Sequence, residues 1–142
     1  MFIDDEKKIK LCIFYKKLGR YYSCFTEKDF RDLDVKEEEK DSFKKVNIVM
    51  KDLTWGLYNE IQENSFSINK SGDRQFNYRL YKENRLTMLI ESWDAVSLGP
   101  DGEAIPIPAN EKNIKSLSPE IAELIIAAYD DESYFTDAEE KK

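Results

Sequence analysis

The chain has 142 residues and a mass of 16.7 kDa, which suits one ordinary domain that buries a core without disulfides or a structural metal. Aromatic residues make up 13% of the chain, so a largely disordered chain is excluded. The net charge is −7, and residues 1–51 carry +2 whereas residues 52–142 carry −9. Because duplex binders normally have a basic excess, this balance argues against nucleic acid as a partner.

Histidine is absent from the chain. This absence excludes Ser–His and Cys–His nucleophile pairs and every histidine-liganded metal site. Two thiols, Cys12 and Cys24, cannot complete a zinc site, so we expect no metal and no cofactor. A disulfide between them is the alternative to reduced, mostly buried thiols, and we favour the thiols. The acidic residues 1–6 and the short apolar runs indicate neither a signal peptide nor a membrane span.

The first third of the chain has the pattern of β-strands. Residues 8–15 alternate in part and are rich in strand formers, Gly19 lies in a turn signal, and residues 21–26 form a second candidate strand. We therefore predict a hairpin over about residues 8–26. Residues 27–45 are dense in charge and predict an exposed loop or mobile linker, and residues 45–51 predict a third short strand.

From residue 52 onward the pattern favours helices. Residues 52–54 supply capping side chains, and Trp55, Tyr58 and Ile61 follow at helical spacing. A polar stretch over residues 63–73 breaks this helix. A longer helix is then expected from about residue 74 to Trp93, capped by Asp73.

The last part of the chain combines a turn, a stiff segment and two helix starts. Residues 99–102 predict a tight turn, and residues 105–108 (Ile-Pro-Ile-Pro) predict an extended arm, because each proline fixes its own φ. The arm either lies over the core as a strap or is presented to a partner. Asn110 caps a short helix, and Pro119 begins a final helix. Its predicted apolar stripe is Ile121, Leu124, Ile125, Ala128 and Tyr129.

Together these elements predict an α+β fold, with a small N-terminal antiparallel sheet or hairpin followed by a C-terminal helical bundle. The expected units are residues 1–51, a β-rich unit with a charged linker; residues 52–130, a helical core; and residues 131–142, an acidic tail. In the tail, Tyr134 and Phe135 are the candidate anchors.

No motif predicts catalysis, and we expect the protein not to be an enzyme. The carboxylate runs at residues 37–39 and 130–132 are typical of solvated faces, and residues 101–103 fit a turn better than a calcium loop. Residues 14–22 interleave basic and aromatic side chains, which suits either stacking on single-stranded nucleic acid or, as we favour, a hairpin with one face in the core.

Short motifs over about residues 46–129 resemble the tail assembly chaperones of tailed bacteriophages. The motifs are Leu53-Thr54-Trp55-Gly56, Asn59-Glu60-Ile61, Trp93-Asp94, Asp101-Gly102, Ile105-Pro106, Asn110-Glu111, Ile114 and Leu117. The resemblance implies a non-enzymatic assembly factor in the host bacterial cytoplasm. It would bind a tape-measure protein or a tail-tube component, and it carries over no catalytic residue.

The two tryptophans suit either the core or an interface. We predict a partner-binding surface built from the Trp55 helix, the end of the long helix and the proline arm. Its expected residues are Trp55, Tyr58, Ile61, Trp93, Ile105, Pro106 and Ile107. One alternative is a minor structural component of the tail, baseplate or neck that stays in the virion, and another is an acidic anti-host protein that mimics DNA. A homo-oligomer is compatible with each of these functions.

Overall fold

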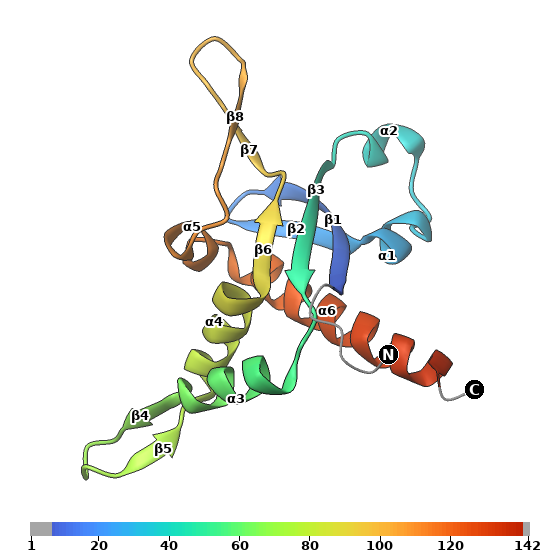
Figure 1. Cartoon of the computed structure of the whole chain (residues 1–142). Helices are drawn as coiled ribbons and strands as arrows, with labels where there is room; N and C mark the ends of the chain where they lie inside the picture. The colour runs from blue at the N-terminus through green and yellow to red at the C-terminus, as the bar shows by residue number, and fades with distance from the viewer. Residues whose placement is uncertain (1–6, 141–142) are drawn as a thin grey trace.

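The structure is a computed structural model that describes the backbone of residues 7–140 and the side chains of residues 7–132 (Figure 1). Its centre is a four-stranded antiparallel sheet with the strand order β2-β1-β3-β6. The four strands are β1 (Lys8–Leu18), β2 (Tyr21–Thr26), β3 (Lys44–Lys51) and β6 (Ile90–Trp93). The predicted hairpin over residues 8–26 and the predicted third strand are confirmed, with Gly19 in the turn at a φ of 64°.

One face of this sheet carries the hydrophobic core. Because side chains alternate along a strand, the odd positions of β1 and the even positions of β3 point to the same side, where their register brings them opposite each other. These buried residues are Ile9, Leu11 and Ile13 opposite Met50, Ile48 and Val46. Helix α6 (Pro119–Glu140) packs on this side against β1 and β2. It buries Ile121, Ile125, Ala128 and Tyr129, so the predicted apolar stripe faces the core, with Leu124 packed at its margin.

Four phenylalanines form a second apolar cluster on the other side of the sheet. The rings of Phe14 and Phe30 stack at 4.0 Å, and Phe43 lies 5.2 Å from Phe30 and 5.9 Å from Phe25. Phe30 belongs to α1 (Glu27–Arg31), which is followed by α2 (Glu37–Lys40). The expected loop or linker over residues 27–45 thus contains two short helices, and its aromatic side chains hold it against the sheet.

The expected helix from residue 74 to Trp93 is wrong at both ends. The helix α4 runs only over Tyr78–Leu89, and Asn77 caps it rather than Asp73. Before it, β5 (Arg74–Phe76) pairs with β4 (Phe66–Ile68), and after it the chain enters β6 and pairs with β3. Backbone pairing with distant segments overrides the helical period of the local sequence.

The expected C-terminal helical bundle is also wrong. Residues 52–118, all of which the structure describes, mix helices with strands, and β6 completes the sheet that the first 51 residues begin. The helices in this part are α3 (Trp55–Glu63), α4 and α5 (Glu111–Lys115), and the long helix that lies along the main sheet is α6 (Figure 1). The fold is therefore a mixed α and β structure around one antiparallel sheet.

The other local predictions in this part agree with the structure. Thr54 caps α3 by accepting a hydrogen bond from the Leu57 amide, and Asn110 caps α5 in the same way. The turn at residues 99–102 joins β7 (Val96–Leu98) to β8 (Ala104–Pro106), with Gly102 at a φ of 81°. The stiff arm is therefore the second strand of a hairpin.

Two hairpins project from the body of the molecule. In Figure 1 the β4–β5 hairpin extends beyond α3 at one end, and the β7–β8 hairpin extends from the opposite end. Helix α6 continues through residues 131–140 of the expected acidic tail, whereas the side chains of Tyr134 and Phe135 lie outside the described part. Within residues 7–140, no helix combines the length and the apolar character that crossing a membrane requires.

Candidate partner-binding surfaces

Large apolar side chains are exposed at both ends of the molecule. One group, which we call the α3 end, consists of Leu53, Trp55 and Tyr58 together with Phe66, Ile68, Phe76 and Tyr78. The other group lies on the β7–β8 hairpin, which we call the arm, and consists of Val96, Leu98 and Ile105. Soluble proteins seldom leave such side chains gathered in the open unless a partner covers them.

Trp55 and Tyr58 form a stacked pair at the start of α3. Their ring centroids lie 5.9 Å apart with an angle of 16° between the planes, and Trp55 is 77% exposed. Ile61 lies one turn further along the helix but points inward, where it is only 2% exposed. The same helix therefore offers two aromatic rings to solvent and uses Ile61 to fix itself to the core.

The β4–β5 hairpin carries a second group of aromatic rings. Phe66 and Phe76 lie opposite each other with their rings edge to face at 5.7 Å, and Phe76 is 5.4 Å from Tyr81 of α4. The guanidinium of Arg74 lies 4.3 Å from the Phe66 ring centroid. Asn69 fixes the loop, because its side-chain oxygen accepts hydrogen bonds from two backbone amides.

Sequence reasoning misses this hairpin because the polar side chains of residues 63–73 predict a break after the Trp55 helix. Two signals were present in that stretch. The segment Phe66-Ser67-Ile68 alternates apolar and polar side chains, and Ser71-Gly72-Asp73 is a turn sequence. Gly72 has a φ of 85°, a conformation that glycine adopts readily.

Trp93 was expected to be part of the partner-binding surface. Instead, its side chain holds the base of the arm. Its indole Nε1–H donates a hydrogen bond of 2.6 Å to the carbonyl oxygen of Ile107, and the Ile107 amide donates to the carbonyl oxygen of Ala95 at 2.9 Å. Both Trp93 and Ile107 are half-buried. These two residues therefore anchor the base of the arm, and the exposed surface of the arm lies beyond them.

The structure divides the seven predicted site residues among four places. Trp55 and Tyr58 lie at the α3 end, and Ile105 and Pro106 are exposed on the arm. Ile61 belongs to the core, and Trp93 and Ile107 form the base of the arm. Because α3 and the arm lie at opposite ends of the molecule in Figure 1, these residues do not form one continuous surface.

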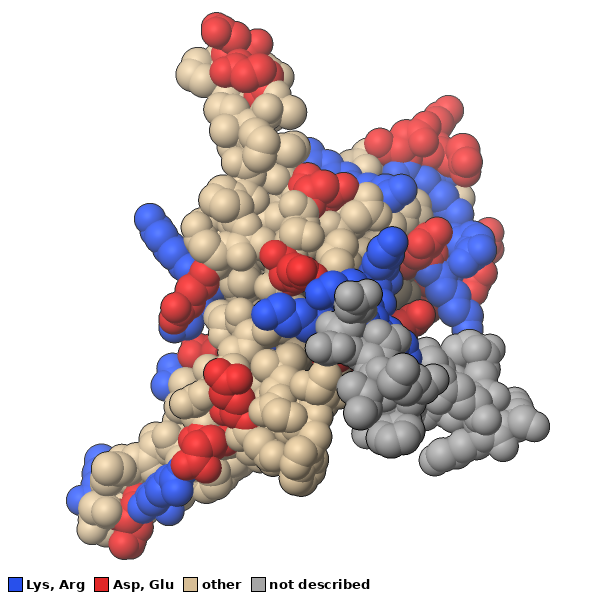
Figure 2. Space-filling model, viewed as in Figure 1, with Lys and Arg blue, Asp and Glu red and all other residues tan. Residues whose placement is uncertain are grey.

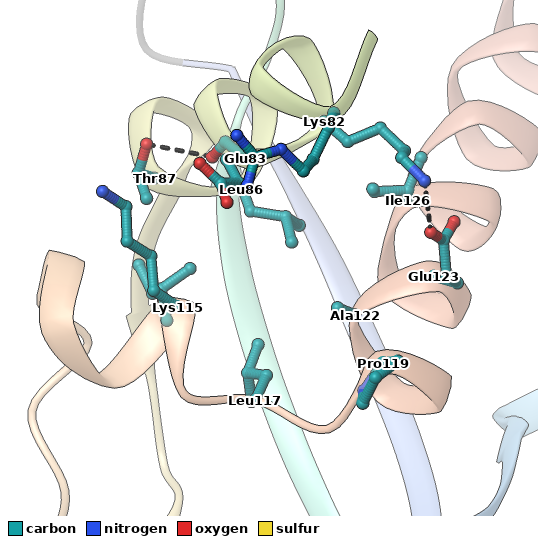
Figure 3. A pocket seen from close by; sticks show the side chains of 12 residues that line it. Lys82, Glu83, Leu86, Thr87, Lys115, Leu117, Pro119, Ala122, Glu123 and Ile126 are labelled. Carbon is teal, nitrogen blue, oxygen red and sulfur yellow. Dashed lines mark hydrogen bonds and ion pairs between the residues drawn. The ribbon is translucent and has the colours of Figure 1, made fainter.

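A hollow of about 280 Å³, which we call the helix pocket, lies between α4, α5 and α6 (Figure 3). Its floor is apolar and its rim is charged. The floor residues are Leu86, Ile114, Leu117, Ala122 and Ile126, and the rim residues are Arg79, Lys82, Glu83, Lys115 and Glu123. Lys82 Nζ donates to Glu123 Oε1 at 2.6 Å, and this hydrogen bond raises the pKa of Lys82.

The two cysteines lie on opposite faces of the main sheet. Cys24 is directly opposite Tyr15, whose side chain lies on the core side, whereas Cys12 lies between the core residues Leu11 and Ile13 and therefore points to the other side. Burial raises the pKa of both thiols. In the part of the chain whose side chains are described, no three His, Cys, Asp or Glu side chains are grouped as a metal site would require.

Comparisons with protein-family models, with curated proteins and with solved structures find no match to this chain. Its surface charge is mixed rather than uniformly acidic. On the face shown in Figure 2, Lys and Arg side chains alternate with Asp and Glu, and the tip of the arm is acidic. The described residues thus form two exposed apolar ends and an apolar pocket, and the surface between them carries both positive and negative charges.

Proposed function

We propose that this chain is a non-enzymatic assembly factor of the phage tail assembly chaperone type. It binds a tape-measure protein, or another tail protein, through the α3 end before the tail is assembled in the host bacterial cytoplasm. The observation that carries the proposal is the 77% exposure of Trp55 in a ring stack with Tyr58. The resemblance of residues 46–129 to tail assembly chaperones supports the choice of partner.

The chemistry of the α3 end suits an apolar helical partner. Tryptophan and tyrosine are the side chains that most often dominate binding energy at protein interfaces. Here Trp55 is stacked with Tyr58, so a partner that covers one ring also meets the other. The same helix also carries charged groups, namely the exposed Glu60 and the Glu63 side chain, which pairs with Arg74 at 2.8 Å.

A DNA mimic is a weaker candidate on these observations. Such a protein needs carboxylates spread like phosphates over a broad face. The face in Figure 2 instead interleaves both charge signs. Several carboxylates of the described residues are paired with lysines, as in the Lys8–Glu91 ion pair at 2.9 Å.

Co-expression with the tape-measure and tail-tube proteins of the phage that encodes this chain tests the proposal. The chain should co-purify with one of them, and replacing both Trp55 and Tyr58 by alanine should weaken binding by more than about tenfold. Tyr21→Ala is the matched control, because Tyr21 is also an exposed aromatic residue but lies at the end of the β1–β2 hairpin. Equal binding by the parent and the double variant would contradict the proposal.

A second measurement separates a chaperone from a structural component of the particle. Mass spectrometry of purified virions should not detect a chaperone, which leaves before the particle is complete. A component of the tail, baseplate or neck would be present in a fixed copy number. Detection at a fixed copy number would therefore replace the chaperone function by the structural one.

A further inference from the structure

We propose that single-stranded nucleic acid binds to the end of the main sheet that the β1–β2 turn and the start of β3 form. We call this surface the basic end, and its cations are Lys16, Lys17, Arg20, Lys44 and Lys45. It contains neither Trp55 nor Tyr58, so this binding is independent of the partner at the α3 end.

The positive charge of the chain is concentrated in three neighbouring strands. Nine of the 22 Lys and Arg lie in residues 7–26 and 44–51, which contain β1, β2 and β3. None of the 29 Asp and Glu lies in these two segments. The net charge of −7 therefore combines a basic sheet with an acidic remainder. The argument against nucleic acid from net charge describes the chain as a whole and does not describe this end of it.

The cations of the basic end are not neutralised by ion pairs. At the far end of β1, Lys8 pairs with Glu91 at 2.9 Å. Within the described side chains, by contrast, none of the five cations of the basic end forms an ion pair. Asp94 acts electrostatically on Lys45, but its carboxylate is held by two hydrogen bonds from Asn47. An anionic ligand can therefore bind here without first breaking an ion pair of the protein.

The register of the sheet brings the cations of two strands together. Residues 44 and 45 of β3 lie opposite residues 15 and 14 of β1, which Lys16 and Lys17 directly follow. Each lysine of β3 is therefore a diagonal neighbour of a lysine of β1 on the same face of the sheet. Like charges at such positions repel each other, and phosphates that bind between them relieve this repulsion.

Aromatic rings lie beside these cations on the face of the sheet away from the core. Phe25 lies opposite Phe14, and Tyr21, four residues earlier in β2, points to the same face as Phe25. Tyr21 directly follows Arg20 and is 60% exposed, whereas Phe25 is half-buried. In proteins that bind single strands, bases stack on such rings while phosphates contact Lys and Arg.

This arrangement favours a single strand over other anionic ligands. The hairpin places one face of residues 14–22 in the core, and the other face still presents Lys16 and Tyr21. An acidic peptide would satisfy the cations but would give the exposed ring of Tyr21 no role. A duplex keeps its bases stacked on one another, so they are not free to stack on the protein. A single strand of DNA or RNA supplies both phosphates and free bases.

Fluorescence anisotropy of labelled oligonucleotides, titrated with the full chain, tests this surface. The probes are an oligothymidylate and an oligouridylate of about 12 nucleotides, a length within the usual site sizes for single strands. At least one of them should bind. Raising the salt from about 50 mM to about 200 mM should weaken binding by about tenfold or more, because about three phosphates release their counterions. A duplex of the same length should bind more weakly than the single strand.

Matched variants locate the binding. Arg20→Gln combined with Lys45→Gln removes two exposed cations and should weaken binding by about tenfold at low salt. The control combines Lys51→Gln with Lys70→Gln, which removes the same charge from the other end of β3 and from the β4–β5 hairpin, and should bind like the parent. Tyr21→Ala should weaken binding by about fivefold or more, and Tyr21→Phe should restore it, because stacking needs only the ring. Circular dichroism checks that each variant is folded.

Three results would overturn the proposal. The first is that neither oligonucleotide binds at low salt, and the second is an equal loss in the basic-end variant and its control. The third is unchanged binding by Tyr21→Ala together with displacement of the probe by polyglutamate, which would point to an acidic protein as the ligand. The double alanine variant of Trp55 and Tyr58 should bind the oligonucleotides like the parent. Failure of nucleic-acid binding would therefore leave the assembly-factor function standing.

Discussion

The indole nitrogen of Trp93 and the carbonyl oxygen of Ile107, fourteen residues apart in the chain, are joined by a hydrogen bond of 2.6 Å. This bond connects the end of β6, and hence the main sheet, to Ile107, the residue that directly follows β8. Trp93 is also packed against the core. One side chain therefore sets the position of the projecting hairpin relative to the body of the protein.

Trp93→Phe should remove this hydrogen bond while keeping an aromatic ring against the core. We expect the free energy of unfolding to fall by about 1–2 kcal/mol, because the half-buried Ile107 carbonyl loses its partner. Hydrogen exchange at the Ile107 amide should also become faster, since the base of the arm is released. Trp55→Phe is the control and should change neither quantity. Unchanged exchange in Trp93→Phe would show that the backbone alone holds the arm.

Two substitutions on α3 should separate stability from binding. Ile61→Ala should lower the free energy of unfolding by about 2–4 kcal/mol, because it leaves a cavity at a residue that is 2% exposed. Trp55→Ala should change it by less than about 0.5 kcal/mol, because that ring is mostly in water. Urea denaturation measures both. A large loss of stability in Trp55→Ala would mean that the ring supports the fold.

Arg85 should be the charged residue that matters most for the packing of α4 on α6. It pairs with Asp130, and its guanidinium lies 5.7 and 5.8 Å from the ring centroids of Tyr81 and Tyr129. Burial opposes the charge of Arg85 and is the largest single effect, but the hydrogen bond that Arg85 donates to Asp130, together with the negative charge of Asp130 and the nearby Tyr81 and Tyr129, raises the pKa of Arg85. Arg85→Met should therefore destabilise the protein by about 1–3 kcal/mol.

Lys82→Met is the matched control for Arg85. Lys82 belongs to the same helix and also pairs with α6, through Glu123, but its pair is more exposed. We expect Lys82→Met to destabilise the protein less than Arg85→Met does, because solvent screens the more exposed pair. Chemical denaturation measures the free energy of unfolding of both variants. An equal loss in Arg85→Met and Lys82→Met would show that the partly buried pair contributes no more than the exposed one.

Acid should weaken the junction between β3 and β6 through Asp94. Its carboxylate accepts hydrogen bonds from the backbone and side-chain nitrogens of Asn47, at 2.6 and 2.8 Å. Partial burial is the largest single effect and acts to raise the pKa of Asp94, but the two bonds from Asn47, the backbone amide of Asp94 and the charge of Lys45 together lower the pKa below its ordinary value of 3.8. A lowered folded-state pKa stabilises the protein above the ordinary value, and this stability is lost as the pH falls through the folded pKa.

The melting temperature of the parent should therefore fall below about pH 4 more steeply than that of Asp94→Asn. Above pH 5 the parent should be the more stable of the two, because the charged carboxylate accepts the stronger hydrogen bonds. Thermal melts followed by circular dichroism between pH 2 and pH 7 measure both effects. Parallel curves for the two proteins would show that Asp94 does not contribute to the acid response.

The thiols of Cys12 and Cys24 should stay unlinked in the folded protein under mild oxidation. They point to opposite faces of the sheet, so an intramolecular disulfide requires the β1–β2 hairpin to unfold. Their raised pKa should also slow reaction with a thiol reagent at neutral pH, because the thiolate is the reactive form. Intact mass after oxidation, compared with and without denaturant, measures this. A loss of two hydrogens from the native monomer would contradict the register of the hairpin.

The sequence alone determined the elements whose signals lie within a few residues of one another. Alternation in residues 8–15 and 45–51 predicted β1 and β3, and the Gly19 turn followed by the strand formers of residues 21–26 predicted β2, which pairs with β1. Side-chain caps at Thr54 and Asn110 located two helix starts, because a cap bonds to an amide only three residues away. The sequence did not predict that Trp55 is exposed, because the helical spacing of Trp55, Tyr58 and Ile61 fits a buried face and an exposed face equally well.

Only the tertiary structure decided which distant segments meet. Residues 90–93 have a helical period, yet they form a strand because β3 offers them backbone partners such as Val49 for Ser92. The same long-range pairing ends α4 at Leu89 and brings Asp94 to Asn47. It also decided that Trp55 and Ile105 lie at opposite ends of the molecule. Local sequence encodes caps, turns and alternation, whereas hydrogen bonds between segments more than forty residues apart depend on the whole chain being folded.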